Sequence, residues 1–233
     1  MRTFRRLFGY CLLPVAASFV ISATGFAHRG AHALDYPVIV NKEERPNPWV
    51  INGCTIEAKA QCEGADLRHA DLKAANLQGA NLRGANLARA DMQYVNLIGA
   101  DLSGANLDGA NLKIAFMQGA KFAKASMRGA NITHVRMNKA DFSGADFTAA
   151  TLEKSMAKGA KFIGAKFINT DVQETKFYEA DLSDALFEGV LIRFAIFQDA
   201  FMEGCKGCPL NWQGTQERQY EMDHSKWDPA DSK

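Results

Sequence analysis

Residues 65–89, ADLRH-ADLKA-ANLQG-ANLRG-ANLAR, decide the fold, because one five-residue pattern recurs there without interruption. Each unit begins with a small residue, follows it with Asp or Asn, and places Leu third. The rhythm holds from residue 60 to residue 204, with 29 central positions spaced five apart from Cys62 to Met202. Only Cys62 and Ala157 depart from a large apolar residue at the centre.

A period of five excludes a continuous helix or a straight strand. Apolar residues five apart drift around a helix and alternate between the two faces of a strand. The chain must therefore turn in every repeat, and the fifth position is Gly, which tolerates tight turns, in 13 of the 29 repeats. One repeat buries only one large and one small side chain, so the repeats are stable only when they stack. The pattern predicts an all-β solenoid.

Residues 80–84, Ala-Asn-Leu-Arg-Gly, resemble the pentapeptide-repeat family, whose consensus is A-(D/N)-L-x-x. The resemblance implies a right-handed quadrilateral β-helix with four repeats, or 20 residues, per coil. Phenylalanines recur at this interval, at Phe122, Phe142 and Phe162, at Phe147, Phe167 and Phe187, and at Phe177 and Phe197. Such spacing predicts aromatic ladders on the inside of separate faces. The repeats make about seven coils, roughly 35 Å long at about 4.8 Å per stacked strand.

The segment before the repeats begins with a leader. Arg2, Arg5 and Arg6 precede an apolar run over residues 7–27 with small residues near its end, which is typical of a secretory signal. We expect residues 1–33 to be a signal peptide, cleaved after Ala33 in preference to Ala27. An uncleaved membrane anchor is the alternative. After cleavage we expect no stable membrane insertion, and a periplasmic or extracellular location. The resemblance adds the thylakoid lumen, which houses similar proteins.

The two ends of a solenoid expose open core and unpaired strand edges, so they need caps. We expect residues 34–59 to form an N-terminal extension and cap, the β-helix to span 60–204, and residues 205–233 to form a C-terminal cap and tail. The N-terminal cap would use Pro46, Pro48, Trp49, Val50 and Ile51. The C-terminal one would use Leu210, Trp212, Tyr220 and Trp227, with a short helix around residues 213–222.

Four cysteines, Cys54, Cys62, Cys205 and Cys208, remain after removal of the leader. The solenoid separates the two pairs by roughly 35 Å, which excludes a single four-cysteine zinc site. Two local disulfides, Cys54–Cys62 and Cys205–Cys208, suit an exported chain and would fasten the caps. A thiol-redox centre at Cys205 and Cys208 is the alternative, but the motif lacks the βαβ context in which such centres occur.

No group of side chains predicts catalysis. His69 and His134 belong to different faces, and the aspartates occupy the turn position, where Asn replaces Asp freely. The sequence contains no phosphate loop, hydrolase elbow or zinc signature. We therefore expect no enzymatic activity, no cofactor and no bound metal.

The charge balance argues against imitation of nucleic acid. The resemblance raises that function, because the gyrase-protecting members of the family imitate the DNA duplex, which requires a strongly negative surface. The whole chain has a formal net charge of +1, and residues 60–204 contain 16 basic and 17 acidic residues. Export would also separate the protein from a cytoplasmic topoisomerase. A DNA-mimicking, topoisomerase-binding protein is thus the less favoured alternative, and we expect no contact with nucleic acid.

One column of repeats stands out. Its centres, which run from Leu72 to Ile192 in steps of 20, include no Phe, and its fifth position is never Gly. Together with the neighbouring face it predicts a contact surface of Tyr94, Ile98, Ile114, Phe116, Met156, Tyr178, Phe194 and Ile196. The alternative is that these apolar residues are scattered without meaning. The sequence thus indicates an exported, non-catalytic structural or interaction module whose partner is another protein or a second copy in a homodimer.

Overall fold

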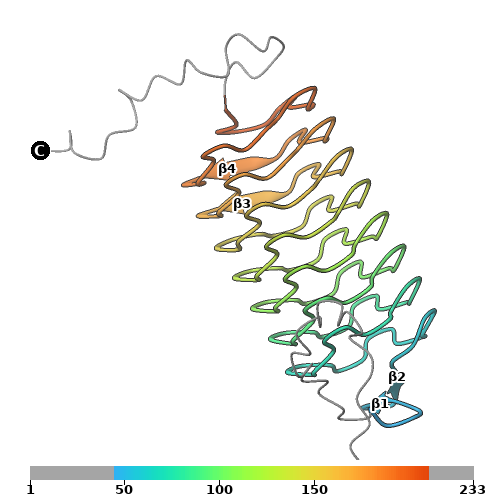
Figure 1. Cartoon of the computed structure of the whole chain (residues 1–233). Helices are drawn as coiled ribbons and strands as arrows, with labels where there is room; N and C mark the ends of the chain where they lie inside the picture. The colour runs from blue at the N-terminus through green and yellow to red at the C-terminus, as the bar shows by residue number, and fades with distance from the viewer. Residues whose placement is uncertain (1–44, 210–233) are drawn as a thin grey trace, which may run out of the picture. The chain divides into compact units, whose positions relative to one another are not determined.

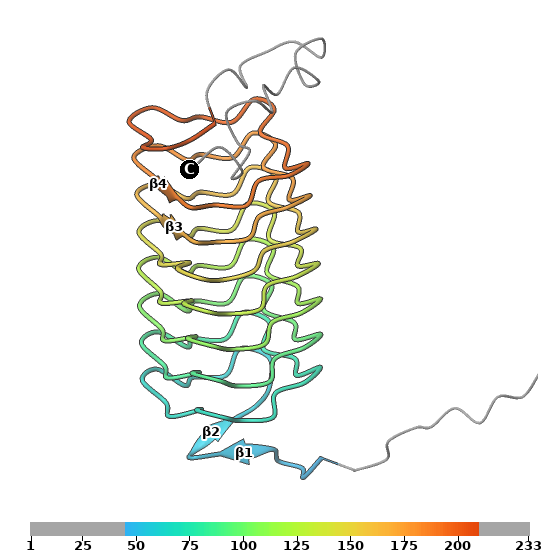
Figure 2. The same cartoon turned by 90° about the vertical axis from the view of Figure 1, so that its left-hand side faces the viewer.

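The residue before each centre pairs in parallel with its counterpart 20 positions along the chain, as in the bridges from Asp71 to Asp91 and from Asn76 to Asn96. Such bridges run from Gln61–Asn81 to Leu186–Lys206, so one coil contains four repeats. The computed structural model describes residues 45–209. Figures 1 and 2 show these residues as a stack of similar coils. The fold is the right-handed quadrilateral β-helix that the sequence predicts.

Regular strands are few, because each coil contributes only a short pairing segment per face. β1 (Val50–Ile51) pairs antiparallel with β2 (Cys54–Thr55), and β3 (Lys166–Ile168) pairs in parallel with β4 (Leu186–Glu188). No residue between 45 and 209 is helical. In that same range no helix is long and apolar enough to cross a membrane.

Four faces follow from the four repeats per coil, and their central residues recur every 20 positions. Face 1 has centres from Cys62 to Met202, face 2 from Leu67 to Phe187, face 3 from Leu72 to Ile192, and face 4 from Leu77 to Phe197. Faces 2 and 4 are opposite each other because the chain visits the faces in order. The residues just before and just after each centre point outward, and the fifth residue of the repeat lies at the corner before the next face.

The turn in each repeat depends on two local features. All 29 fifth positions have a positive φ, although only 13 of them are Gly. The Asp or Asn before the centre accepts a hydrogen bond from the amide two residues later, as when Ser103 N donates to Asp101 Oδ1 at 3.0 Å. This side chain replaces a backbone acceptor in the turn, which explains why Asp and Asn both serve there.

The core consists of the central and the small residues, which are buried along nearly the whole solenoid. The predicted aromatic ladders are confirmed. Phe122 stacks on Phe142 and Phe142 on Phe162, with ring centroids 4.9 and 5.2 Å apart. Phe147 stacks on Phe167 at 5.1 Å. The ladders of faces 1 and 2 also touch each other, since the rings of Phe142 and Phe147 are 5.5 Å apart.

Three hydroxyl residues replace the small residue without leaving a polar atom unsatisfied. The hydroxyl groups of Ser155, Thr170 and Thr175 are fully buried, and each donates to a carbonyl 23 residues earlier. Ser155 Oγ donates to Ile132 O at 2.7 Å and accepts from Val135 N at 2.9 Å. These bonds join successive coils, so the hydroxyl groups stabilise the stacking of the coils.

Residues 45–59, the described part of the predicted N-terminal cap, pack on the first coil. Trp49 and Ile51 pack against the core, and the amide of Ile56 donates to Trp49 O at 2.7 Å. The left-handed turn of the repeat is present already at Lys59, whose φ is 61°. At the other end the ladder continues to Lys206, which pairs with Leu186. The expected signal peptide, residues 34–44 and the expected helix around 213–222 lie outside the described residues.

Candidate functional site

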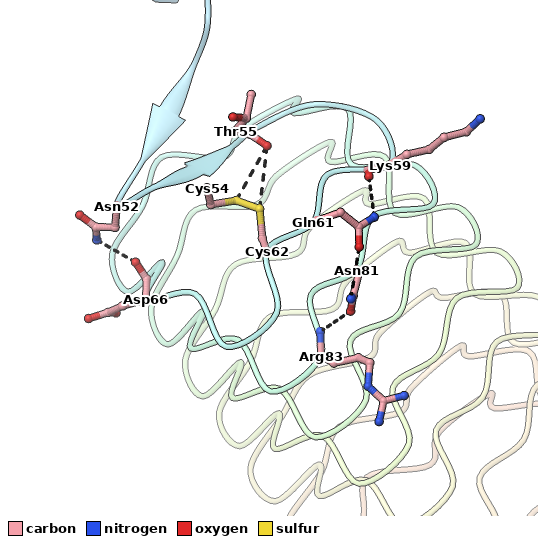
Figure 3. The surroundings of a disulfide bond; sticks show 9 residues. All are labelled: Asn52, Cys54, Thr55, Lys59, Gln61, Cys62, Asp66, Asn81 and Arg83. Carbon is pink, nitrogen blue, oxygen red and sulfur yellow. Dashed lines mark hydrogen bonds between the residues drawn. A yellow bond between two sulfur atoms is a disulfide. The ribbon is translucent and has the colours of Figure 1, made fainter.

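The structure joins the four cysteines in the pairs that the sequence favours. Cys54 and Cys62 form one disulfide, and both are almost fully buried. Cys62 occupies a central position of face 1, so the disulfide fills the space that a large apolar residue fills elsewhere. Figure 3 shows this bond beside Asn52, whose side chain donates to Asp66 O at 2.7 Å. Both contacts attach the β1–β2 hairpin to the first coil.

Cys205 and Cys208 form the second disulfide, and both are half-buried at the last coil. A redox thiol in a C-x-x-C motif is activated at the start of a helix, and no helix is present in residues 45–209. The surroundings of this pair therefore give no support to a thiol-redox centre.

The described residues offer no group that resembles a catalytic or metal centre. No cluster of three or more His, Cys, Asp or Glu side chains within residues 45–209 could hold a metal ion. His69 lies at a corner of face 2 and His134 at a corner of face 3, three coils away, and both are exposed.

The predicted contact residues lie on face 4 and at its corner with face 3. Tyr94, Ile114 and Phe194 occupy the fifth position of face 3 repeats, which forms this corner. The other members, Ile98, Phe116, Met156, Tyr178 and Ile196, point outward from face 4. Tyr94, Met156 and Phe194 are 49%, 43% and 68% exposed, and the remaining five are half-buried. The structure thus brings all eight residues onto one side of the solenoid.

The corner carries backbone strain. Ile114 has a φ of 61°, and Tyr94 and Phe194 each have a φ of 59°. A β-branched or bulky residue rarely adopts this left-handed conformation, which costs about 1–2 kcal/mol per residue relative to Gly. Gly occupies the equivalent corner at many other repeats, so these apolar side chains are kept at some expense in stability. Sixteen of the 29 fifth positions have this conformation without Gly, but only the face 3 column lacks Gly in every repeat.

Face 4 also lacks Asp or Asn at most of the positions directly before its centres. The position before the centre is Asn76 and then Asn96, but the next five members of the column are neither Asp nor Asn: they are Phe116, Arg136, Met156, Lys176 and Ile196. On the other three faces this position reverts to Asp or Asn after at most one substitution until the last two coils. Gln118, on the same face, has the one buried side-chain oxygen without a hydrogen-bond partner among residues 45–209. Face 4 therefore departs from the pattern that best serves the turn.

The cations of this region differ in how they are neutralised. Lys154, at the corner, has its ammonium 2.8 Å from Glu153 Oε1 and 3.6 Å from Glu174 Oε1. The hydrogen bond to Glu153 raises the pKa of Lys154. Lys158 lies 3.0 Å from Glu179. Arg136 instead places its guanidinium over the Phe116 ring, 5.6 Å from the centroid.

On face 2, acidic side chains accept hydrogen bonds from donors on the same face. Arg68 donates two hydrogen bonds to the Asp66 carboxylate, at 2.8 and 2.6 Å. The side-chain hydrogen bond from Arg68 lowers the pKa of Asp66 to about 2. Asp108 accepts from the Arg128 amide at 3.0 Å, and Asp146 from the Thr148 amide at 2.9 Å. Three carboxylates of this face thus accept hydrogen bonds from donors on the same face.

Further exposed apolar residues were not part of the prediction: Val50, Ile163, Leu191 and Phe201. Leu191 and Phe201 belong to the last described repeats, and the bridges among residues 45–209 end at Leu186 and Lys206. Counting the repeats places Leu191 and Phe201 at the end of the repeat region, and this position could have predicted their exposure. The positive φ of Ile114 follows from the backbone and has no signal in the residue type itself.

Comparisons with known proteins agree with this geometry. The family model for pentapeptide repeats matches residues 65–104, 115–148, 145–184 and 158–193, in 8 copies. No curated protein matches the chain.

Solved structures of pentapeptide repeat proteins are also similar. Rfr23 from the cyanobacterium Cyanothece 51142 is 23% identical over 46% of this chain and 58% of that chain, with a TM-score of 0.31. A protein of the Arabidopsis thaliana thylakoid lumen is 27% identical over 57% of this chain and 69% of its own length, with a TM-score of 0.32. QnrB1, a plasmid-mediated fluoroquinolone resistance protein, is 16% identical over 73% of this chain and 97% of its own, with a TM-score of 0.29.

Proposed function

Since this chain belongs to the pentapeptide-repeat family, we propose that it is an exported, non-catalytic module that binds a protein partner through face 4 and its corner with face 3. The observation that best supports this proposal is the strained corner. Ile114 and Tyr94 keep apolar side chains at left-handed positions, beside half-buried Phe116. A turn that only had to fold would be more stable with Gly at both positions.

Within residues 45–209, no cluster of side chains supports a catalytic role. The exposed histidines are three coils apart, and the half-buried Cys205 and Cys208 are bonded to each other. A rigid stack of coils presents a fixed array of side chains, which suits recognition of a partner with little loss of conformational entropy on binding.

Binding as an imitation of DNA has less support. A duplex carries one negative charge per about 1.7 Å of its axis, whereas residues 60–204 have a net charge of −1. Face 4 carries Arg136, Lys158 and Lys176, which would repel a protein that binds phosphate groups. We therefore propose a partner other than a nucleic-acid-binding enzyme.

The experiment that tests the proposal replaces Ile114, which is strained, and Phe116, which is aromatic. The variant Ile114→Ser with Phe116→Ser should lose the partner in affinity capture from the native compartment while it remains folded, with a loss in free energy of unfolding of about 1 kcal/mol or less. The matched control is Ile163→Ser, which removes an exposed isoleucine from face 1. Loss of the partner from both variants, or from neither, would contradict a contact through face 4.

Export can be measured in the same sample. Mass spectrometry without reduction should give an N-terminus after residue 33 or residue 27 and a mass that corresponds to two intact disulfides. A chain that retains residues 1–33 and has five free thiols, Cys11 included, would contradict export.

A further inference from the structure

Face 4 differs from the other three faces in having no carboxylate among its outward residues. The other faces each carry at least four: Glu63, Asp101, Asp141, Asp181 and Glu203 on face 1, Asp66, Asp108, Asp146 and Glu188 on face 2, and Asp71, Asp91, Glu153 and Asp171 on face 3. The outward residues of face 4 are Asn76, Gln78, Asn96, Ile98, Phe116, Gln118, Arg136, Asn138, Met156, Lys158, Lys176, Tyr178, Ile196 and Gln198. This face is therefore apolar and cationic, with acids only at its corners.

Two of its cations lack an acidic partner. Arg136 and Lys176 are exposed, and neither has a carboxylate within ion-pairing distance among residues 45–209. On face 2 Arg68 is engaged by Asp66, whereas Arg128 and Lys166 are exposed without an ion pair in the described part of the chain, so face 4 is distinguished by cations that alternate with apolar side chains on a face without carboxylates. Charges that find no partner within the molecule are available to a partner outside it, and complementary charge fixes both the choice of partner and its register.

The spacing along the face favours one kind of partner. Phe116, Arg136, Met156, Lys176 and Ile196 are joined by successive parallel bridges, so apolar and cationic side chains alternate from coil to coil. Stacked strands are about 4.8 Å apart. A helix along the column presents a residue about every 5.4 Å, close to this spacing. An extended strand presents one about every 6.6 Å and would leave the register within two coils.

We propose that face 4 binds an acidic amphipathic helix of a partner protein, which lies along the solenoid axis. This inference rests on the proposed function and specifies the chemistry of the partner. Carboxylates of the helix pair with Arg136 and Lys176, and its apolar residues pack on Phe116, Met156 and Ile196. A second copy of the chain fits less well, because face 4 against face 4 brings no carboxylate to neutralise either set of cations.

The test uses the full chain and a defined probe. The probe is a fluorescent helical peptide of about 20 residues, about 30 Å long, with Glu and Leu on one side. Its counterpart has Lys in place of each Glu. The Glu peptide should bind and the Lys peptide should not, as measured by fluorescence anisotropy. Arg136→Glu with Lys176→Glu should weaken binding of the Glu peptide by about tenfold or more.

The matched control moves the same charge changes to the opposite face. Arg128→Glu with Lys166→Glu alters two exposed cations of face 2 and should change the affinity by less than about twofold, since surface charges a Debye length away are screened. Equal loss in both variants would overturn the inference, as would equal binding of the Glu and Lys peptides.

Two further outcomes separate the inference from its premise. Tighter binding to phosphatidylglycerol vesicles than to the Glu peptide would overturn it in favour of an anionic lipid surface, and a concentration-dependent dimer abolished by Phe116→Ser would overturn it in favour of self-association. If Ile114→Ser with Phe116→Ser loses the native partner while Arg136→Glu with Lys176→Glu keeps it, the acidic helix is wrong and the proposed function stands.

Discussion

Faces 2 and 4 have the same backbone and different exteriors. Inside, both contain phenylalanine stacks, with Phe147 on Phe167 in face 2 and Phe177 on Phe197 in face 4, at 5.1 and 4.9 Å. Outside, face 2 carries four carboxylates, three of which accept hydrogen bonds from donors on the same face, whereas face 4 carries apolar residues and cations. The inner positions thus determine the coil, and the outer positions are free to determine what binds.

The largest effect should come from an inner position. Phe147→Ala removes a fully buried ring from face 2 and should lower the free energy of unfolding by about 3–5 kcal/mol. Phe116→Ala removes a half-buried ring from the outside of face 4 and should lower it by about 1 kcal/mol or less. Chemical denaturation followed by circular dichroism gives both values. Similar losses from the two variants would mean that the exterior of face 4 also holds the fold.

The two disulfides allow the same comparison between buried and more exposed positions at the two ends of the solenoid. Cys54→Ala with Cys62→Ala opens a link between residues eight apart and should lower the free energy of unfolding by about 2–3 kcal/mol. It also empties buried volume at a central position. Cys205→Ser with Cys208→Ser opens a link of three residues between half-buried side chains, and its effect should be smaller. Thermal unfolding of the oxidised proteins measures both, and the reverse order would be inconsistent with a buried N-terminal link.

A gain in stability is expected at the corner of face 4. Ile114→Gly relieves a left-handed isoleucine and should raise the free energy of unfolding by about 1 kcal/mol. Ile163→Gly is the control, because Ile163 is not among the residues with positive φ, and glycine there should lower the value by about 0.5–1 kcal/mol. A loss of stability from Ile114→Gly would show that Ile114 is retained for packing and would remove the strain argument for a contact surface.

The smallest effect concerns the charges of face 2. The pKa of Asp66 is about 2 because Arg68 donates to its carboxylate. An unfolded Asp has a pKa of about 3.9, so this interaction favours the folded state above about pH 4 and is lost as the pH falls toward 2. An NMR titration should give the low value, and Arg68→Gln should raise it toward 3.9. An Asp66 pKa unaffected by Arg68→Gln would mean that face 2 does not satisfy its acids locally.

Much of the fold was accessible from the sequence because the repeat leaves few choices. The fivefold rhythm predicts the solenoid, and the family resemblance implies a coil of 20 residues, which the interval between Phe122 and Phe142 supports and the bridges confirm. The exterior was less accessible. Exposure of Tyr94 and half-burial of Ile98 depend on how neighbouring coils shield each other, which the repeat pattern does not contain. The strain at Ile114 needs the backbone angle itself.

The cationic character of face 4 could have been predicted from the sequence, because sorting the residues at intervals of 20 shows which of them share a face. Arg136 and Lys176 could be placed in one column by counting. Their lack of a carboxylate, however, depends on side-chain reach across the corners, where Glu179 pairs with Lys158 instead.

Photo-crosslinking tests most directly whether a partner protein binds the outside of face 4. A photoreactive residue in place of Met156 lies on face 4, and one in place of Lys166 lies at the equivalent repeat position of face 2. In the native compartment, position 156 should form an adduct with the partner protein, and position 166 should not. Equal adducts from both positions, or an adduct from position 166 alone, would contradict the account.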